Sequence, residues 1–178
     1  MNQIEEFATF VGEHVKQHLI DSFVEQGHDL TGKMKASIRY ELINLADFSA
    51  TVRFYMLSYG LVQDNGILPE RIPYGGRESS AETSEYIQGL IEFAMLRFRI
   101  GSDAAVGAAF AIARIHKREG LHTIKSARFS RTGERTDFIA TALKRAIPNI
   151  KKEASKYVRL FFSFLIREYS GRVYTKAA

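Results

Sequence analysis

The sequence predicts an α+β fold, in which an antiparallel β-hairpin or small sheet packs against long helices and one loop is extended. Residues 38–57 contain two runs in which apolar and polar side chains alternate, the period of half-buried strands. The flanking segments repeat apolar residues every three or four positions, as amphipathic helices do. Because a lone hairpin is at best marginally stable in water, we expect helices to cover its apolar face, namely those over residues 4–24, 103–118 and 150–169.

The first expected element is an amphipathic helix over residues 4–24 that ends near Gly27. Its apolar stripe consists of Ile4, Phe7, Val11, Val15, Leu19 and Phe23. His14 and His18 lie one helical turn apart, a spacing that can bind a metal ion. No third ligand is apparent nearby in the sequence, so we predict no metal site.

Residues 27–34 nearly match the phosphate-binding loop, a pattern that needs a hydroxyl after its lysine to hold magnesium. Met34 occupies that position and has no hydroxyl. Such a loop also follows a strand and opens a helix, whereas we expect this segment to follow a helix and lead into a strand. We therefore predict that the chain uses no nucleotide cofactor.

The hairpin is expected to pair two strands through a turn at residues 46–49. The first run places three apolar residues on one face of a strand: Ile38, Tyr40 and Leu42. The second run does the same with Ala50, Val52, Phe54 and Met56. Residues 58–66, with glycines near both ends, fit a single helical turn.

Residues 67–82 are expected to form a projecting loop, since they hold Pro69 and Pro73 together with adjacent glycines and serines. The length of this loop exceeds what a compact domain usually tolerates without a functional reason or disorder. Both a flexible connector and an arm that touches a neighbouring molecule fit the pattern.

The part from residue 84 to residue 169 is expected to be largely helical. Ser79 and Glu82 have the spacing of a capping box, and a stripe of apolar residues follows at helical intervals. Ser102 can cap a second helix, over residues 103–118, which Gly120 ends. Small residues in this second helix favour close packing in the core.

The last helical stretch begins after Asp137, and Pro148 is expected to interrupt or kink it. A long helix follows over residues 150–169, and a short tail covers residues 170–178. Between residues 160 and 166 only Ser163 is polar, so we expect burial on more than one side. That burial is either in the core or at a subunit interface, for which the candidates are Phe161, Phe162 and Phe164.

The charge of the chain is divided between its two parts. Residues 1–103 hold 9 Lys or Arg and 15 Asp or Glu, a net −6, whereas residues 104–178 hold 16 and 5, a net +11. Two solvated surfaces explain such a pattern most simply. A polyanionic partner, or an oligomer in which the acidic part of one copy meets the basic part of the next, also explains it.

The stretch from residue 114 to residue 135 has seven basic and two acidic residues and is expected to be mainly loop. It lacks the interleaved aromatic residues of a single-strand binder, so it favours phosphate contacts without sequence readout. Its candidate contacts to a DNA channel or to a neighbouring protein are Arg114, Lys117, Arg118, Lys125, Arg128, Arg131 and Arg135.

Composition bounds the remaining possibilities. At 178 residues with 46% hydrophobic residues, the chain can bury a sizeable core, and we expect one domain, residues 1–178. The absence of cysteine excludes disulfides and thiolate metal sites. The acidic start is unlike a secretory leader, and the longest uncharged run, residues 104–113, is too short to cross a bilayer. No hydrolase or metalloprotease motif occurs, so we predict no catalytic residues and no enzyme.

Several segments resemble one known family in the same order along the chain. Residues 31–38, the hairpin and residues 59–66 look like the core of the tail-completion or neck proteins of tailed double-stranded DNA bacteriophages. Residues 110–121 are similar to a helix of that family that ends in a basic turn and a glycine. Residues 137–143 resemble the segment that opens its last helix.

The resemblance implies a structural virion protein without catalysis or cofactor, assembled in the cytoplasm of the bacterial host. It implies a cyclic homo-oligomer, a hexamer or dodecamer, that lies in the head–tail connector between portal and tail. The partners would be other neck, portal or tail proteins, together with packaged double-stranded DNA, and no membrane. The alternative that the residues leave open is a non-specific nucleic-acid-binding protein that uses residues 114–135.

Overall fold

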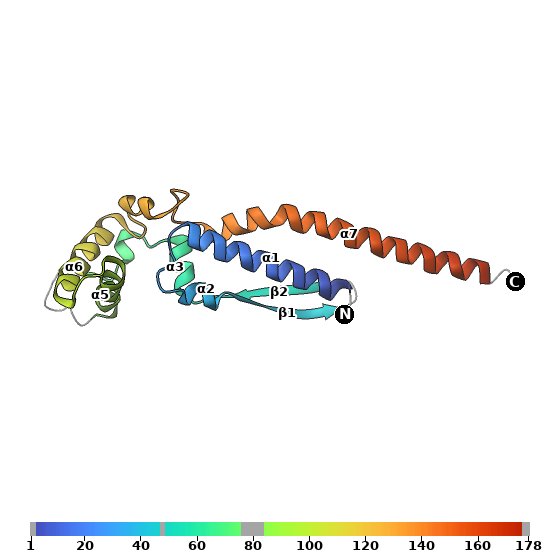
Figure 1. Ribbon diagram of the computed structural model, residues 1–178, viewed down its shortest axis with the longest axis horizontal. Coiled ribbons are helices and arrows are strands. Elements are labelled where there is room, and N and C mark those ends of the chain that lie inside the picture. Colours follow the sequence, from blue (N-terminus) through green and yellow to red (C-terminus); the bar gives the residue numbers. More distant parts are fainter. Residues whose placement is uncertain (1–2, 47–48, 76–83, 176–178) are drawn as a thin grey trace. The chain divides into compact units, whose positions relative to one another are not determined.

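The computed structural model of the protein describes residues 3–46, 49–75 and 84–175, and it confirms the α+β class (Figure 1). Two compact units divide the chain. The hairpin unit comprises Met1–Ile20, Ile38–Tyr55 and Ala140–Ala178, and the helical unit comprises Asp21–Ser37 and Met56–Ile139. Helices α1 (Gln3–Glu25) and α7 (Phe138–Thr175) contribute to both units, so the single domain stays a prediction.

The described sheet of the hairpin unit pairs β1 (Arg39–Ala46) with β2 (Ser49–Tyr55) in antiparallel fashion. Tyr40 lies opposite Phe54, so these two predicted apolar residues share one face, and their aromatic rings are 6.2 Å apart. Leu42 and Val52 form the next pair on that face. The strands extend further than predicted, because Ala46 pairs with Ser49, and residues 47–48 lie outside the described residues.

Helix α1 covers the apolar face of the hairpin, which confirms the helix predicted over residues 4–24 (Figure 1). The two elements approach each other closely at Gly12, where an added Cβ would overlap the aromatic ring of Tyr40. Ala8 and Val15, which lie about one turn on either side of Gly12, are buried. A glycine in mid-helix costs helix propensity, and here it lets the backbone lie against an aromatic ring.

Helix α7 packs along the same α1 helix and runs antiparallel to it. The aromatic rings of Phe7 and Tyr157 are 5.2 Å apart, and Asn149 Nδ2 lies 3.4 Å from His14 Nε2. Of the two predicted effects of Pro148, interruption of the helix was wrong, because α7 is continuous through it, and a kink stays a prediction. Pro148 is exposed, so water can solvate the carbonyl that loses its helical donor.

The helical unit is built around α5 (Glu85–Phe98) and α6 (Ser102–Glu119), which are joined by only three residues. Such a short connection makes consecutive helices antiparallel neighbours. The core between them consists of Ile72, Tyr74, Ile87, Phe110 and Ala113. We had expected the helix at residues 103–118 to cover the hairpin. It belongs to the helical unit instead, because its small buried face packs against α5 and the segment before it.

The predicted projecting loop packs into the helical unit over its first part. Ile67 exchanges two backbone hydrogen bonds with Leu121, and the η1 turn (Pro69–Arg71) follows. Ile72 and Tyr74 are then buried in the core, so this part does not project. Residues 76–83, with Ser79 and Glu82 of the predicted capping box, lie outside the described residues.

The caps of both helices differ from prediction by a few residues. Ser84 caps α5, since its side-chain oxygen accepts a hydrogen bond from the backbone N–H of Ile87 at 3.2 Å. Gly101 occupies the N-cap position of α6, so Ser102 is already helical. Gly120 ends α6 as predicted, with a positive φ of 81°.

The segment after α1 turns into the short helix α2 (Lys33–Ser37) before β1 begins, so our expectation that it leads directly into a strand was wrong. Met34 is buried, and its side chain lies against Gly60 of α3 (Tyr59–Asn65), where an added Cβ would overlap it. Burial of this apolar side chain gives Met34 a packing role.

In the described part of the chain, no helix combines the length and apolarity needed to cross a membrane.

Gly12→Ala should destabilise the protein, whereas Gly107→Ala should stabilise it. Alanine adds about 1 kcal/mol of helix propensity at either position. At Gly12 the new methyl group would overlap Tyr40, and overpacking of this kind costs about 1–3 kcal/mol. Gly107 lies in α6 with open space around it, so a methyl group there adds helix propensity without overlapping a neighbour. Urea unfolding measures both free energies, and equal stabilisation by the two variants would contradict the close approach of α1 to the hairpin.

Candidate functional site

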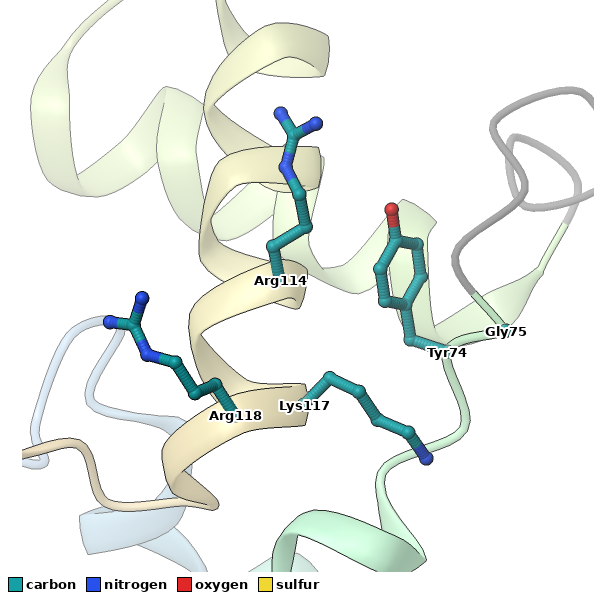
Figure 2. Close-up of a pocket in the computed structure, with 5 residues that line it drawn as sticks. All are labelled: Tyr74, Gly75, Arg114, Lys117 and Arg118. Carbon is teal, nitrogen blue, oxygen red and sulfur yellow. The ribbon is translucent and has the colours of Figure 1, made fainter.

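Three of the predicted basic contacts lie together on one face of α6. Lys117 and Arg118 lie three and four residues after Arg114, so each is a neighbour of Arg114 on the helix surface. With Tyr74 and Gly75 they line an open hollow of about 440 Å³ (Figure 2). In Figure 2, Lys117 reaches towards the chain at Tyr74 and Arg118 points the other way.

Lys117 also holds the segment before Tyr74 in place. Its Nζ donates to the backbone carbonyls of Ile72 at 3.2 Å and of Glu70 at 3.5 Å. Arg118 forms an exposed ion pair with Glu119, which contributes little stability because water screens it. All three cationic side chains of the hollow are exposed to solvent.

The next predicted contacts lie in η2 (Ile124–Phe129), so the stretch is more ordered than the loop we expected. Lys125 and Arg128 are both exposed. The guanidinium of Arg128 lies 4.7 Å from the centre of the Phe129 ring, and that of Arg97 lies 4.8 Å from it. A cation over an aromatic face is attracted by about 0.5–1 kcal/mol at exposed sites. Phe129 thus holds two cations close together.

The last two predicted contacts differ from each other. Arg131 has an exposed side chain, and its backbone N–H donates to the carbonyl of Glu25 at 2.8 Å. Arg135 is half-buried, and its Nη1 donates to the carbonyl of Gly27 at 3.3 Å. Burial, and then the charge of Arg97, lower the pKa of Arg135. The guanidinium of Arg135 therefore lies partly inside the helical unit, where it binds the backbone at Gly27.

Sequence reasoning missed a cluster of two half-buried histidines beside Arg135. The rings of His28 and His122 are 4.9 Å apart. His28 Nε2 lies 3.2 Å from Gln26 Oε1, and His122 Nε2 donates to the carbonyl of Gln63 at 2.9 Å. The only sequence signal is that each histidine closely follows a glycine with positive φ, Gly27 or Gly120, which turns the chain inward.

The histidine pair that the sequence did single out lies in the hairpin unit. His14 and His18 meet edge to face, with ring centres 4.6 Å apart. Burial, and then the charge of His18, lower the pKa of His14. Among the described residues, no group of three or more potential ligands is placed to hold a metal ion.

Two apolar surfaces are exposed, one in each unit. On α7, Leu160, Phe162 and Ile166 have exposed fractions of 55%, 57% and 64%, so the core interpretation of this stretch was wrong for them. Phe161 is half-buried and 6.0 Å from the Phe162 ring, and the side chain of Phe164 is outside the described part of the structure. On α5, the exposed apolar residues are Phe93, Met95, Leu96 and Phe98.

Comparisons with protein-family models, with curated proteins and with solved structures find no match for this chain. The resemblance to phage connector proteins therefore stays a prediction.

His28 should make the protein less stable as the pH falls. Burial, followed by the charges of Arg135 and His122, lowers the pKa of His28 to about 3, whereas an unfolded histidine has a pKa of about 6.5. Between these values the unfolded chain binds more protons. The contribution of neutral His28 to the free energy of unfolding is therefore complete above about pH 6.5, and it is lost as the pH falls towards 3.

His28→Gln should flatten the dependence of unfolding free energy on pH between 8 and 5. One proton allows at most about 1.4 kcal/mol per pH unit, and partial solvation of the ring reduces this value. Urea unfolding at several pH values measures the slope. The pH 8 value isolates the packing effect, because His28 is neutral in both states there. An unchanged slope would show that His28 titrates normally.

Proposed function

We propose that this chain is a structural subunit of a tailed-bacteriophage virion, assembled as a ring of identical copies in the head–tail connector or tail-completion region. The observation that carries the proposal is the pair of exposed apolar surfaces, on α7 at Val158, Leu160, Phe162 and Ile166 and on α5 at Phe93, Met95, Leu96 and Phe98. Contiguous exposed apolar residues mark surfaces that bind another protein.

Two unlike surfaces are what a ring of subunits needs. In a head-to-tail joint, one surface of a subunit meets a different surface of the next copy. Within the hairpin unit, α7 continues beyond the N-terminal end of α1, so its last turns extend past the helix that it packs on (Figure 1). The α5 surface belongs to the other unit and differs in sequence. The order of the resembling segments supports a connector protein over other ring-forming assemblies.

The distribution of exposed charges also supports assembly into a connector. The exposed cations Arg118, Lys125, Arg128 and Arg131 all lie in the helical unit. They would face packaged DNA or an acidic connector protein, while the acidic part of each copy steers the basic part of the next. Exposed pairs are individually weak and are screened by salt, so they guide assembly and the apolar contacts hold it.

Phe162→Asp should prevent self-assembly, whereas Ser163→Asp should permit it. Both variants add one negative charge to an exposed position of α7, and only the first removes an apolar contact. Loss of a central apolar contact typically costs 2 kcal/mol or more, which weakens association by roughly 30-fold. Light scattering and negative-stain images at matched concentrations give the result. A parent chain that stays monomeric at high concentration with connector partners present, or equal assembly of the two variants, would contradict the proposal.

The alternative function, non-specific nucleic-acid binding, is favoured by the cationic hollow on α6. Its described lining holds Arg114, Lys117 and Arg118 and includes no Asp or Glu. Phosphate contacts of this kind carry no sequence information, so affinity should depend on salt and not on base order.

Arg114→Gln combined with Arg118→Gln should reduce the salt dependence of DNA binding. Each lost phosphate contact lowers the slope of log K against log salt by about 1, so the pair should remove about 2. Fluorescence anisotropy with two duplexes of unrelated sequence measures the slopes. Lys156→Gln, an exposed cation in the hairpin unit, is the matched control. Equal slopes for the double variant and this control would exclude the hollow as the DNA contact.

A further inference from the structure

A partly enclosed cavity of about 480 Å³ lies within the helical unit. Its apolar wall comes mainly from α5 and α6, through Leu90, Phe93, Ile112 and Ile115. Small-molecule sites in proteins span about 300–1,000 Å³, are mostly apolar and carry a few convergent polar groups. The size and apolar lining of this cavity match such a site.

The polar lining of the cavity has one sign of charge. Lys125, Arg128 and Arg135 contribute to it, together with His116 and His122, and the described lining contains no Asp or Glu. One ring nitrogen of His116 already has a partner, because its Nδ1 lies 2.8 Å from the Tyr86 hydroxyl. Lys125, Arg128 and Arg135 therefore give the polar part of the lining a positive charge, which complements an anion.

The cations gather around Phe129. Arg97 and Arg128 both lie over its ring, at 4.8 and 4.7 Å, and the charge of Arg97 also acts on Arg135. None of the three arginines forms an ion pair with a carboxylate in the described part of the chain. Like charges so close repel one another, and a bound anion would remove that cost.

A second observation points to the same place. The Nε atom of Arg135 is buried and has no acceptor among the described residues. A buried donor without an acceptor is costly, and a charge-assisted hydrogen bond to an anion is among the stronger ones. The same residue lines the cavity, so its unsatisfied donor lies where a ligand would be.

We propose that this cavity binds an amphipathic organic monoanion, with its carboxylate or sulfonate at Arg128 and Arg135 and its hydrocarbon part between α5 and α6. The argument for this ligand does not rest on the ring of subunits proposed above, although the cavity and the α5 surface share Phe93 and Phe98. Apolar contact supplies most of the affinity, and the arginines select the charge.

The probes are decanoate, decanol and decyltrimethylammonium, three ten-carbon chains with negative, neutral and positive heads. The chain has no tryptophan, so Phe93→Trp in the cavity wall provides a single tryptophan, which can be excited selectively over the eight tyrosines. Decanoate below its micelle concentration should shift the emission to shorter wavelength in a saturable manner, and should bind at least roughly tenfold more tightly than the other two. In the unmodified chain, decanoate should raise the unfolding temperature.

Variants then test the arginines. In the Phe93→Trp background, Arg128→Gln should weaken decanoate binding roughly tenfold, and Arg97→Gln should do so less strongly. Arg131→Gln is the matched control, an exposed arginine outside the cavity lining. We do not rely on Arg135→Gln alone, because Arg135 also holds the carbonyl of Gly27. Equal binding of the three probes, no saturable binding of decanoate, or equal effects of Arg128→Gln and Arg131→Gln would each overturn the proposal.

Discussion

A sheet of two strands has an apolar face and too few neighbouring strands to bury it, and this constraint governs the hairpin unit. Helix α1 supplies the missing layer, and Gly12 lets its backbone lie against Tyr40. Helix α7 then packs on α1 through Phe7 and Tyr157. Since α7 is longer than the surface it covers, its last turns extend beyond α1 and keep apolar side chains such as Phe162 exposed (Figure 1).

The helical unit depends instead on contacts between residues far apart in the chain. The Asp64 side chain accepts a hydrogen bond from the backbone N–H of Ile139 at 2.9 Å, and so secures the first turn of α7. Ile67 and Leu121 join the segments before α5 and after α6. Gly27 lies so close to the carbonyl of Phe129 that a Cβ would overlap it. These contacts bring His28, His122 and Arg135 into one polar cluster.

The apolar and the cationic candidate surfaces are suited to different kinds of interaction. Exposed apolar residues on α7 and α5 are suited to holding copies together, because apolar burial is not screened by salt. Exposed cations on α6 and η2 are suited to phosphates or acidic proteins, whose attraction salt weakens. Arg135 belongs to neither surface, since it is half-buried beside the histidines. A basic run in sequence therefore combines surface and interior residues.

The sequence by itself determined the α+β class, the helix at residues 4–24, the hairpin and the faces of its strands, because these depend on local periodicity. It also identified six cations that remain exposed or line the hollow on α6. Tertiary structure alone decided that α6 packs with α5 and not on the hairpin, and that Ile72 and Tyr74 are core residues. It also formed the His28–His122 cluster and the cavity at Arg135, because these join segments about one hundred residues apart, for which periodicity carries no signal.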